Sequence, residues 1–341
     1  MDAIAKEGTL RTPVILRITT GRLNPYLSTL LLFLSLVAIW QLVTYLEGWS
    51  SIQPAFHLAV FFTVTITYAV MVTHFIIKGH QKDLAQIASL LPKQKDQLVN
   101  WNSYLQQYKS TLKLDLASVT MGLIHSAIGV GPFYRLLTMT SKYYFFDIWM
   151  TFLIVATWYV ITQACALFVN NLRLFQQLVN ICKIDILYTQ KLTPFIRAGV
   201  RSTLAFIGTY ALFPLLRFDD IKYLIFNPAI LIFIPIVAAM ILIPTLPLRR
   251  RIKNLKKKEL ELIEQALNGN KEAMSESRIA SHISSLNIVD LLSYRKTIQN
   301  TKEIPVNVPI AFRFLLYILL PLLTWVAASL VDKIVVALLQ L

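Results

Sequence analysis

The chain has little charge for its length. Charged residues make up 15% of its 341 residues, whereas a soluble globular protein carries about 25%. Hydrophobic residues reach 56% and are gathered in blocks of roughly 20 residues, the length that a helix needs to cross a hydrocarbon layer about 30 Å thick. The composition therefore argues against a soluble globular fold and predicts an all-α bundle of membrane-spanning helices.

Residues and motifs that carry known chemistry are scarce. The two cysteines, Cys165 and Cys182, have neither a CxxC partner nor a histidine neighbour, so we expect structural thiols and no metal or redox site. The sequence also lacks a P-loop, GxSxG, HExxH, GxGxxG and a pair of carboxylates within an apolar block. We therefore expect no catalytic residue and no cofactor. Because a coupled carrier usually holds an acidic group near the middle of the membrane, active transport is disfavoured.

Six apolar segments are clear candidates for membrane spans, and a seventh is weaker because it contains glycines, a proline and an arginine. The clear ones are Tyr26–Leu46, Ala55–Ile77, Ile148–Val169, Ile196–Leu216, Pro228–Leu248 and Ile310–Leu330, and the weaker one is Leu116–Leu137. We expect a cytoplasmic arm (1–24), six spans with cytoplasmic helical loops at 78–114 and 171–194 (25–248), a cytoplasmic helical hairpin (249–307), and a last span with the C-terminus (308–341).

Positive charge orients these spans. The net charge is +15, and the basic residues flank apolar blocks, as cytoplasmic loops do. Basic residues precede the first span and cluster again in Arg249–Lys258; both groups lie inside only if Leu116–Leu137 crosses. This predicts seven spans in the inner (plasma) membrane, with the N-terminus inside. The partners expected are the lipid bilayer and its anionic headgroups, and not nucleic acid, which requires an exposed basic face with base-reading residues.

Several helices are predicted to extend into the cytoplasm. Gln94–Leu114 has an amphipathic pattern, and one helix could run from Asp147 to about Tyr188, about 60 Å. The sixth span is expected to continue to a stop at Asn268-Gly269-Asn270, followed by a second helix over Ser275–Gln299. This hairpin is either an intramolecular antiparallel pair or a stalk that joins copies of the chain. A cytoplasmic protein could also bind it, at 249–307.

The weak seventh segment contains the candidate pore residues. Gly129, Gly131 and Pro132 predict a break in the helix, and broken helices at membrane depth occur where they are buried in protein or line a watery cavity. His125 and Ser126, one turn earlier, could then line a pore, with His125 responding to protons. The alternative is that the small residues allow close helix packing and that His125 is bonded to a neighbouring helix.

Basic residues at the cytoplasmic ends of spans are candidates for anions or lipid headgroups. Arg197 and Arg201 are four residues apart and so share one helix face, and Arg249, Arg250 and Arg251 follow the sixth span directly. Two arginines at a cytoplasmic mouth could attract an anion, or their side chains could extend to lipid phosphate.

A resemblance is confined to the C-terminal third. It rests on Pro244-Thr-Leu-Pro247-Leu-Arg-Arg-Arg, on Lys256-Lys-Lys-Glu-Leu-Glu-Leu, on Ile304-Pro305 and on Leu319-Leu-Pro321-Leu-Leu-Thr-Trp325. In this order the segment resembles a group of uncharacterised prokaryotic multi-pass membrane proteins with a charged helical hairpin before the last span. That group often has an aromatic residue where this chain has Ile304. The resemblance implies the topology and no activity.

Two functions remain from the sequence. The first is a passive channel-like pore, formed by a homo-oligomer, with His125 and the break at Gly129–Pro132 near its path. The second is a non-catalytic scaffold or sensor whose cytoplasmic helices bind a partner or anionic lipid. Water at the break separates them, because only a pore would bring water to that depth.

Overall fold

The computed structural model describes residues 24–48, 56–90, 111–212, 215, 228–277, 279, 287–303, 319 and 323. Their helices are α2 (Pro25–Leu46), α3 (Phe56–Ile87), α5 (Leu112–Ile124), α6 (Pro132–Leu137), α7 (Tyr144–Ile181), α8 (Thr193–Tyr210), α10 (Pro228–Leu267) and α11 (Ile288–Asn300), with the short turns η2 (Ala88–Leu90), η3 (His125–Val130, π-helical), η4 (Thr189–Leu192) and η6 (Lys271–Glu276). No strand occurs among these residues, which confirms the all-α class for them. The predicted helix Gln94–Leu114, apart from its last four residues, and the predicted span Ile310–Leu330, apart from two, lie outside this set.

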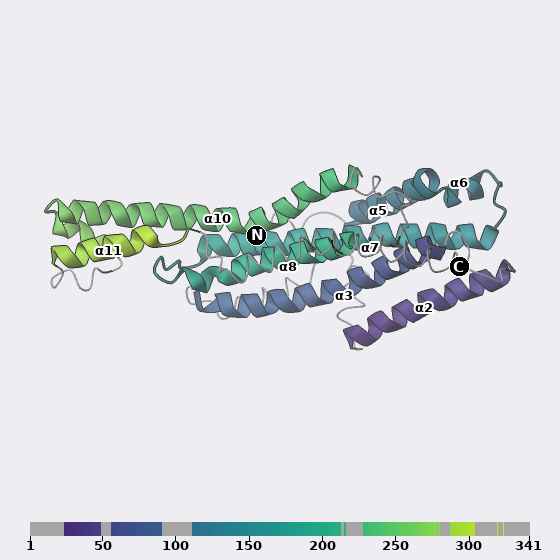
Figure 1. Cartoon of the computed structure of the whole chain (residues 1–341), viewed down its shortest axis with the longest axis horizontal. Coiled ribbons are helices and arrows are strands. Elements are labelled where there is room, and N and C mark those ends of the chain that lie inside the picture. Colours follow the sequence, from purple (N-terminus) through teal and green to yellow (C-terminus); the bar gives the residue numbers. More distant parts are fainter. Residues whose placement is uncertain are drawn as a thin grey trace, which may run out of the picture.

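The helices lie along one long axis, which makes the molecule a rod (Figure 1). Within the part that the structure describes, three helices are long and apolar enough to cross a membrane: α2, α3 together with η2, and α7. The helical hairpin formed by the second half of α10, η6 and α11 projects at the opposite end of the rod from α2 and α6 (Figure 1).

Ring contacts set the register of the three apolar helices. Trp40 of α2 packs on Phe56 at the start of α3 and on Phe146 near the start of α7, with ring centroids 6.2 and 5.9 Å away. α3 and α7 therefore begin at the same end and run parallel. α2 runs back along them, so its first turn ends up against the middle of α3, where the rings of Tyr26 and His74 lie 5.9 Å apart.

The apolar core continues past the first turn of α2. A cluster that includes Leu84, Phe175, Phe195 and Ile252 joins α3, α7, α8 and α10, and each of these side chains is 1% exposed or less. Burying a large apolar side chain contributes about 1.5–3 kcal/mol, so this four-helix region is a firmly packed part of the rod in its own right.

The boundaries of α8 differ from the predicted span Ile196–Leu216. The Arg201 guanidinium of α8 contacts Asp83 of α3, six residues beyond the predicted end of the α3 span at Ile77. Only Ser202–Tyr210, about 14 Å of helix, lies level with that span, and Tyr210 is the last residue of α8. The first half of α8 belongs instead to the four-helix region, where two arginines can find a buried acidic partner.

α7 ends at Ile181, seven residues before the predicted end at Tyr188. The segment contains no proline or glycine, so the cause is tertiary. The guanidinium of Arg251 in α10 donates hydrogen bonds to the carbonyl oxygens of Val179 and Cys182, and the backbone N–H of Lys183 donates to the carbonyl of Leu90, 2.8 Å away. These contacts bind backbone groups at the end of α7 and direct the chain away from the helix.

The hairpin confirms one predicted boundary and corrects another. α10 ends at Leu267, directly before Asn268-Gly269-Asn270, and Gly269 has the left-handed φ of +100° that favours glycine. The second helix does not begin at Ser275: η6 occupies that position, and α11 starts after Asn287. The side chains of Asn287 and Asp290 form a capping box there, which fixes the start of α11.

Candidate functional site

The break predicted in Leu116–Leu137 is present and lies between α5 and α6. α5 passes into the π-helical turn η3 at His125, and Gly131 then adopts a φ of +86°. Pro132 opens α6 as its first residue, where its missing N–H has no cost. π-helical turns are rare and frequently occur at functional sites. The sequence therefore located the break correctly through glycine and proline chemistry.

The residues before the break are fastened to α7. His125 accepts a hydrogen bond at Nδ1 from the indole Nε1–H of Trp158, 2.8 Å away. Ser126 is fully buried, and its hydroxyl donates to Thr151 over 3.2 Å. This arrangement corresponds to the packing alternative, in which His125 bonds to a neighbouring helix. Ser126 faces α7 and so does not face water.

The opposite side of η3 is open. Ile128 is 84% exposed, and Gly129, next to it, is exposed as well. A Cβ atom at Gly129 would lie 2.4 Å from Cδ2 of the His125 ring. Glycine at this position therefore leaves room for the imidazole beside the break, where His125 bonds Trp158.

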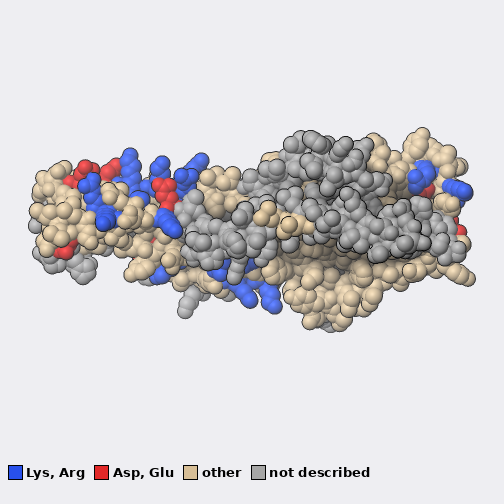
Figure 2. Space-filling model, viewed as in Figure 1, with Lys and Arg blue, Asp and Glu red and all other residues tan. Residues whose placement is uncertain are grey.

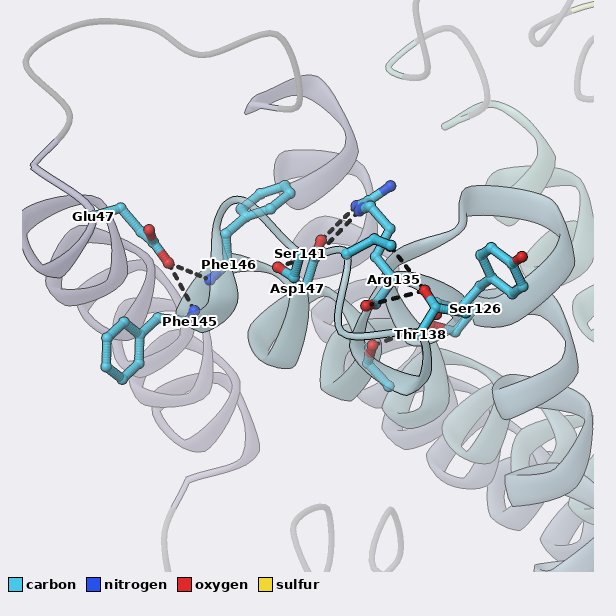
Figure 3. A network of polar contacts seen from close by, with 11 residues as sticks. Glu47, Ser126, Arg135, Thr138, Ser141, Phe145, Phe146 and Asp147 are labelled. Carbon is cyan, nitrogen blue, oxygen red and sulfur yellow. Dashed lines mark hydrogen bonds and ion pairs between the residues drawn. The ribbon is translucent and has the colours of Figure 1, made fainter.

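A polar network holds α6 to the start of α7 (Figure 3). The guanidinium of Arg135 makes a two-point ion pair with the buried Asp147, with Nε 2.9 Å from Oδ2. The hydroxyl of Ser141 donates to the same carboxylate oxygen over 2.8 Å. Because Arg135 and Asp147 come from the two ends of a short turn, the ion pair closes that turn and fixes α6 antiparallel to α7.

α2 joins the same end of α7. Oε1 of Glu47 accepts hydrogen bonds from the backbone N–H groups of Phe145, at 2.7 Å, and Phe146, at 3.1 Å (Figure 3). A carboxylate on the free N–H groups of a first helical turn is stabilised by the helix dipole. At the other end of α5, the side-chain amide of Gln163 donates to the carboxylate of Asp115. Polar bonds therefore hold both ends of the α5–α6 unit against α7.

Arg197 and Arg201 contact an acidic residue that was not predicted as a site residue from the sequence. Asp83 of α3 is 1% exposed; its carboxylate lies 2.6 Å from Nη1 of Arg201 and 3.5 Å from Nε of Arg197. A Cβ atom at Gly79 would lie 2.4 Å from the Arg201 guanidinium, so glycine there makes room for that group on the α3 backbone. Asp83 supplies one negative charge for the two arginines. It holds Arg201 within the protein, whereas the Arg197 side chain remains 38% exposed.

Histidine and amide side chains add buried polarity beside this ion pair. His80 lies one turn before Asp83; it is fully buried and packs on Phe175, with Nε2 3.3 Å from the carbonyl oxygen of Ala198. Asn171 lies one turn before Phe175 on α7, and it too is fully buried, with neither side-chain atom hydrogen-bonded. In the described part, no group of three or more His, Cys, Asp or Glu residues is placed to hold a metal ion.

We expect Asn171→Leu to raise the stability of the protein. A buried polar group without a partner costs about 1–3 kcal/mol, and leucine has a similar volume. The melting temperature of the purified variant in detergent measures its stability. Asn170→Leu, the same replacement at a half-buried neighbour, is the control. A lower melting temperature for Asn171→Leu would contradict the expectation and show that the amide has a partner in solution.

The three arginines after the sixth predicted span have different surroundings. Arg251 is held against the C-terminal carbonyls of α7, as described above, and Nε of Arg249 lies 3.3 Å from the carboxylate of Glu303. Arg250 is exposed and makes no ion pair within the described residues. Lys256 donates to the carbonyl oxygens of Gln299, at 2.6 Å, and Thr301. Much of this basic cluster therefore stabilises helix ends.

The thiol of Cys182 lies beside the contact of Arg251 with the end of α7. Cys182 is 1% exposed, and burial raises the pKa of its thiol above the usual value, although the nearby Arg251 guanidinium opposes the shift. A buried thiol with a raised pKa reacts slowly with thiol reagents. Burial of this kind is typical of a structural cysteine.

The hairpin has an apolar core of its own. The buried residues Ile263, Met274, Leu291 and Ile298 pack together between α10, η6 and α11, and Ile186 from the segment after α7 joins them; each is 4% exposed or less. Glu259 accepts hydrogen bonds from Ser277 and Tyr294 at the edge of this core. The exposed ion pair of Lys258 with Glu276 lowers the pKa of the Glu276 carboxyl. The described part of the hairpin is thus an intramolecular pair of helices.

Comparison with known proteins adds no relative. No protein-family model matches the chain, and no curated protein and no solved structure is detectably similar to it.

Proposed function

We propose that the chain is a seven-span membrane protein with its N-terminus inside, and that copies of it surround a passive channel-like pore. The outward side of η3, represented by Ile128 and Gly129, lies on the path. The observation that carries this proposal is the exposed break itself. His125 at the start of η3 bonds Trp158, a residue in the middle of the predicted span Ile148–Val169, and Ile128 is 84% exposed.

Irregular backbone at such a depth requires cover. Exposed N–H and C=O groups cost several kcal/mol each in hydrocarbon, so non-helical backbone within a bilayer is buried in protein or lines water. The inner side of η3 is covered by α7 through His125 and Ser126. Its outer side is then covered by another copy of the chain or faces a water-filled path, and an oligomeric pore supplies both.

The distribution of charge supports the membrane orientation. In Figure 2, the blue basic residues of the described part are concentrated on the half of the rod that carries the hairpin, and a smaller group lies at the opposite end. α8 and α10 are adjacent and run in opposite directions (Figure 1). The start of α8 and the end of α10 therefore both lie on the hairpin side of the rod, in agreement with the proposed orientation.

The test is access of a charged thiol reagent to residue 128. We expect Ile128→Cys to react with a membrane-impermeant methanethiosulfonate, and ion flux through liposomes to fall on reaction, in a background lacking Cys165 and Cys182. Phe152→Cys is the matched control: Phe152 is 53% exposed on α7, next to the level that Ser126 and Thr151 share. We expect no reaction there, because this side chain faces lipid. Equal reactivity of the two cysteines would refute the path.

One observation favours the scaffold as a second candidate. Ile288, Val289 and Leu292 of α11 are 66%, 71% and 49% exposed, and they point away from the hairpin core that holds Leu291. An exposed apolar patch commonly marks a contact with another protein. If the hairpin is a docking surface, replacing these three residues by serine abolishes cross-linking of its cytoplasmic partner in cells. Cross-linking that survives the triple replacement would exclude this patch.

A further inference from the structure

One exposed face of α3 changes from apolar to basic within a single turn. Met71 and Phe75 are 48% and 58% exposed, and the next residues on that face, Lys78 and Lys82, are exposed lysines. Spacings of four, three and four residues keep all four side chains on one side of a helix. An exposed methionine and phenylalanine suit hydrocarbon, and lysine ammonium groups directly after them suit the layer of lipid phosphates.

A second helix marks the same level. Tyr26, at the start of α2, is 53% exposed and packs its ring edge-on against His74 of α3, one residue from Phe75. Tyrosine is enriched where membrane meets water, because its ring is apolar and its hydroxyl is polar. The change from Phe75 to Lys78 on α3 therefore coincides with an independent interfacial residue on α2.

The two lysines differ from the arginines nearby because their charge is available. Arg197 and Arg201 are paired with Asp83 on another face of α3. Lys78 and Lys82 make no ion pair within the described residues. Two uncompensated ammonium groups one turn apart can close on one phosphate from two sides.

We propose that this face of α3 holds an anionic phospholipid, with its phosphate between Lys78 and Lys82 and an acyl chain along Phe75 and Met71. The site rests on the proposed membrane orientation. It differs from the arginines that the sequence analysis selected, because those are engaged in contacts within the protein, apart from Arg250. Each lysine near an anionic surface contributes about a fivefold gain in affinity, so the pair contributes about 30-fold.

The experiment follows thermal stabilisation of the full chain in neutral detergent as phosphatidylglycerol is added. We expect stabilisation that phosphatidylcholine and inorganic phosphate do not give. Lys78→Gln with Lys82→Gln should shift the midpoint of the lipid titration about 30-fold upward. Lys253→Gln with Lys257→Gln removes two exposed charges from α10 and should leave the midpoint unchanged. An unshifted midpoint for the α3 pair, or an equal shift for the α10 pair, would overturn the site.

A second measurement separates this site from the orientation on which it rests. Nitroxide labels at Met71→Cys, Phe75→Cys, Lys78→Cys and Lys82→Cys are compared in liposomes for collision with oxygen and with a water-soluble nickel complex. We expect oxygen to dominate at 71 and 75 and nickel at 78 and 82. Nickel dominance at all four overturns both the orientation and the lipid site. The expected pattern, together with an unshifted lipid titration, overturns the lipid site alone.

Discussion

Asp83→Leu is expected to destabilise the protein by about 3–5 kcal/mol, because it leaves the largely buried Arg201 without its counterion. Asp83 is 1% exposed and the Arg201 side chain 17%, so water cannot replace the lost carboxylate. We expect a melting temperature lower by about 6 °C or more, measured by thermal unfolding of the purified protein in detergent.

Two further variants sharpen this prediction. In the double variant Asp83→Leu with Arg201→Leu, most of the stability should return, since replacing both members of a buried pair by apolar groups is often neutral. Glu261→Gln is the control, because its partner Lys257 is 78% exposed, and an exposed pair is worth at most about 1 kcal/mol. If Asp83→Leu cost no more than Glu261→Gln, the ion pair would not hold α8 to α3.

Gly122→Ala is expected to separate α5 from α7, at a cost of about 1–3 kcal/mol. A Cβ atom at Gly122 would lie 2.7 Å from the backbone Cα of Val155. Backbone cannot move aside as a side chain does, so the whole of α5 must shift. The shift also strains the bonds of Gln163 with Asp115 and of His125 with Trp158 on either side. The melting temperature in detergent measures the loss of stability. The reactivity of Ile128→Cys with the thiol reagent measures the disturbance beside His125.

The choice of rescuing residue makes this prediction specific. Val155→Ala should not restore Gly122→Ala, because the closest contact is with backbone. Gly208→Ala offers the contrasting case: its Cβ would lie 1.8 Å from the hydroxyl oxygen of Tyr68, a side-chain atom, so Tyr68→Leu should restore most of its stability. Rescue of Gly122→Ala by Val155→Ala would show that side-chain crowding, and not the approach of the two backbones, sets this contact.

Local chemistry was enough to predict several features of the fold. Apolar length predicted the extent of α2 and the start of α10, and Asn268-Gly269-Asn270 marked the end of α10 because glycine accepts a positive φ. Gly131 and Pro132 likewise located the break between α5 and α6. The start of α11 could also have been found: Asn287 followed three residues later by Asp290 is a capping pattern, which the apolar periodicity from Ser275 obscured.

Features that depend on contacts across the sequence could not be predicted. Asp83 and Arg201 are 118 positions apart, and a single acidic residue among lysines gives no sign of a buried partner. The end of α7 is set by Arg251, 69 positions after Cys182. For both arginines the sequence suggested lipid or an anion as the partner, because pairing with a distant carboxylate or carbonyl leaves no local pattern.

The distance between Asp83 and its partner also has a consequence for biosynthesis. A ribosome adds about 5–20 residues per second, so Asp83 emerges roughly 6–24 s before Arg201, which is 118 residues later. A carboxylate without a partner in lipid for that long would be unfavourable. Asp83 lies beyond the predicted end of the α3 span, so its carboxylate can stay hydrated until Arg201 is made. Closure of α3 onto α8 is then a late step of assembly, after the apolar helices have been inserted and oriented.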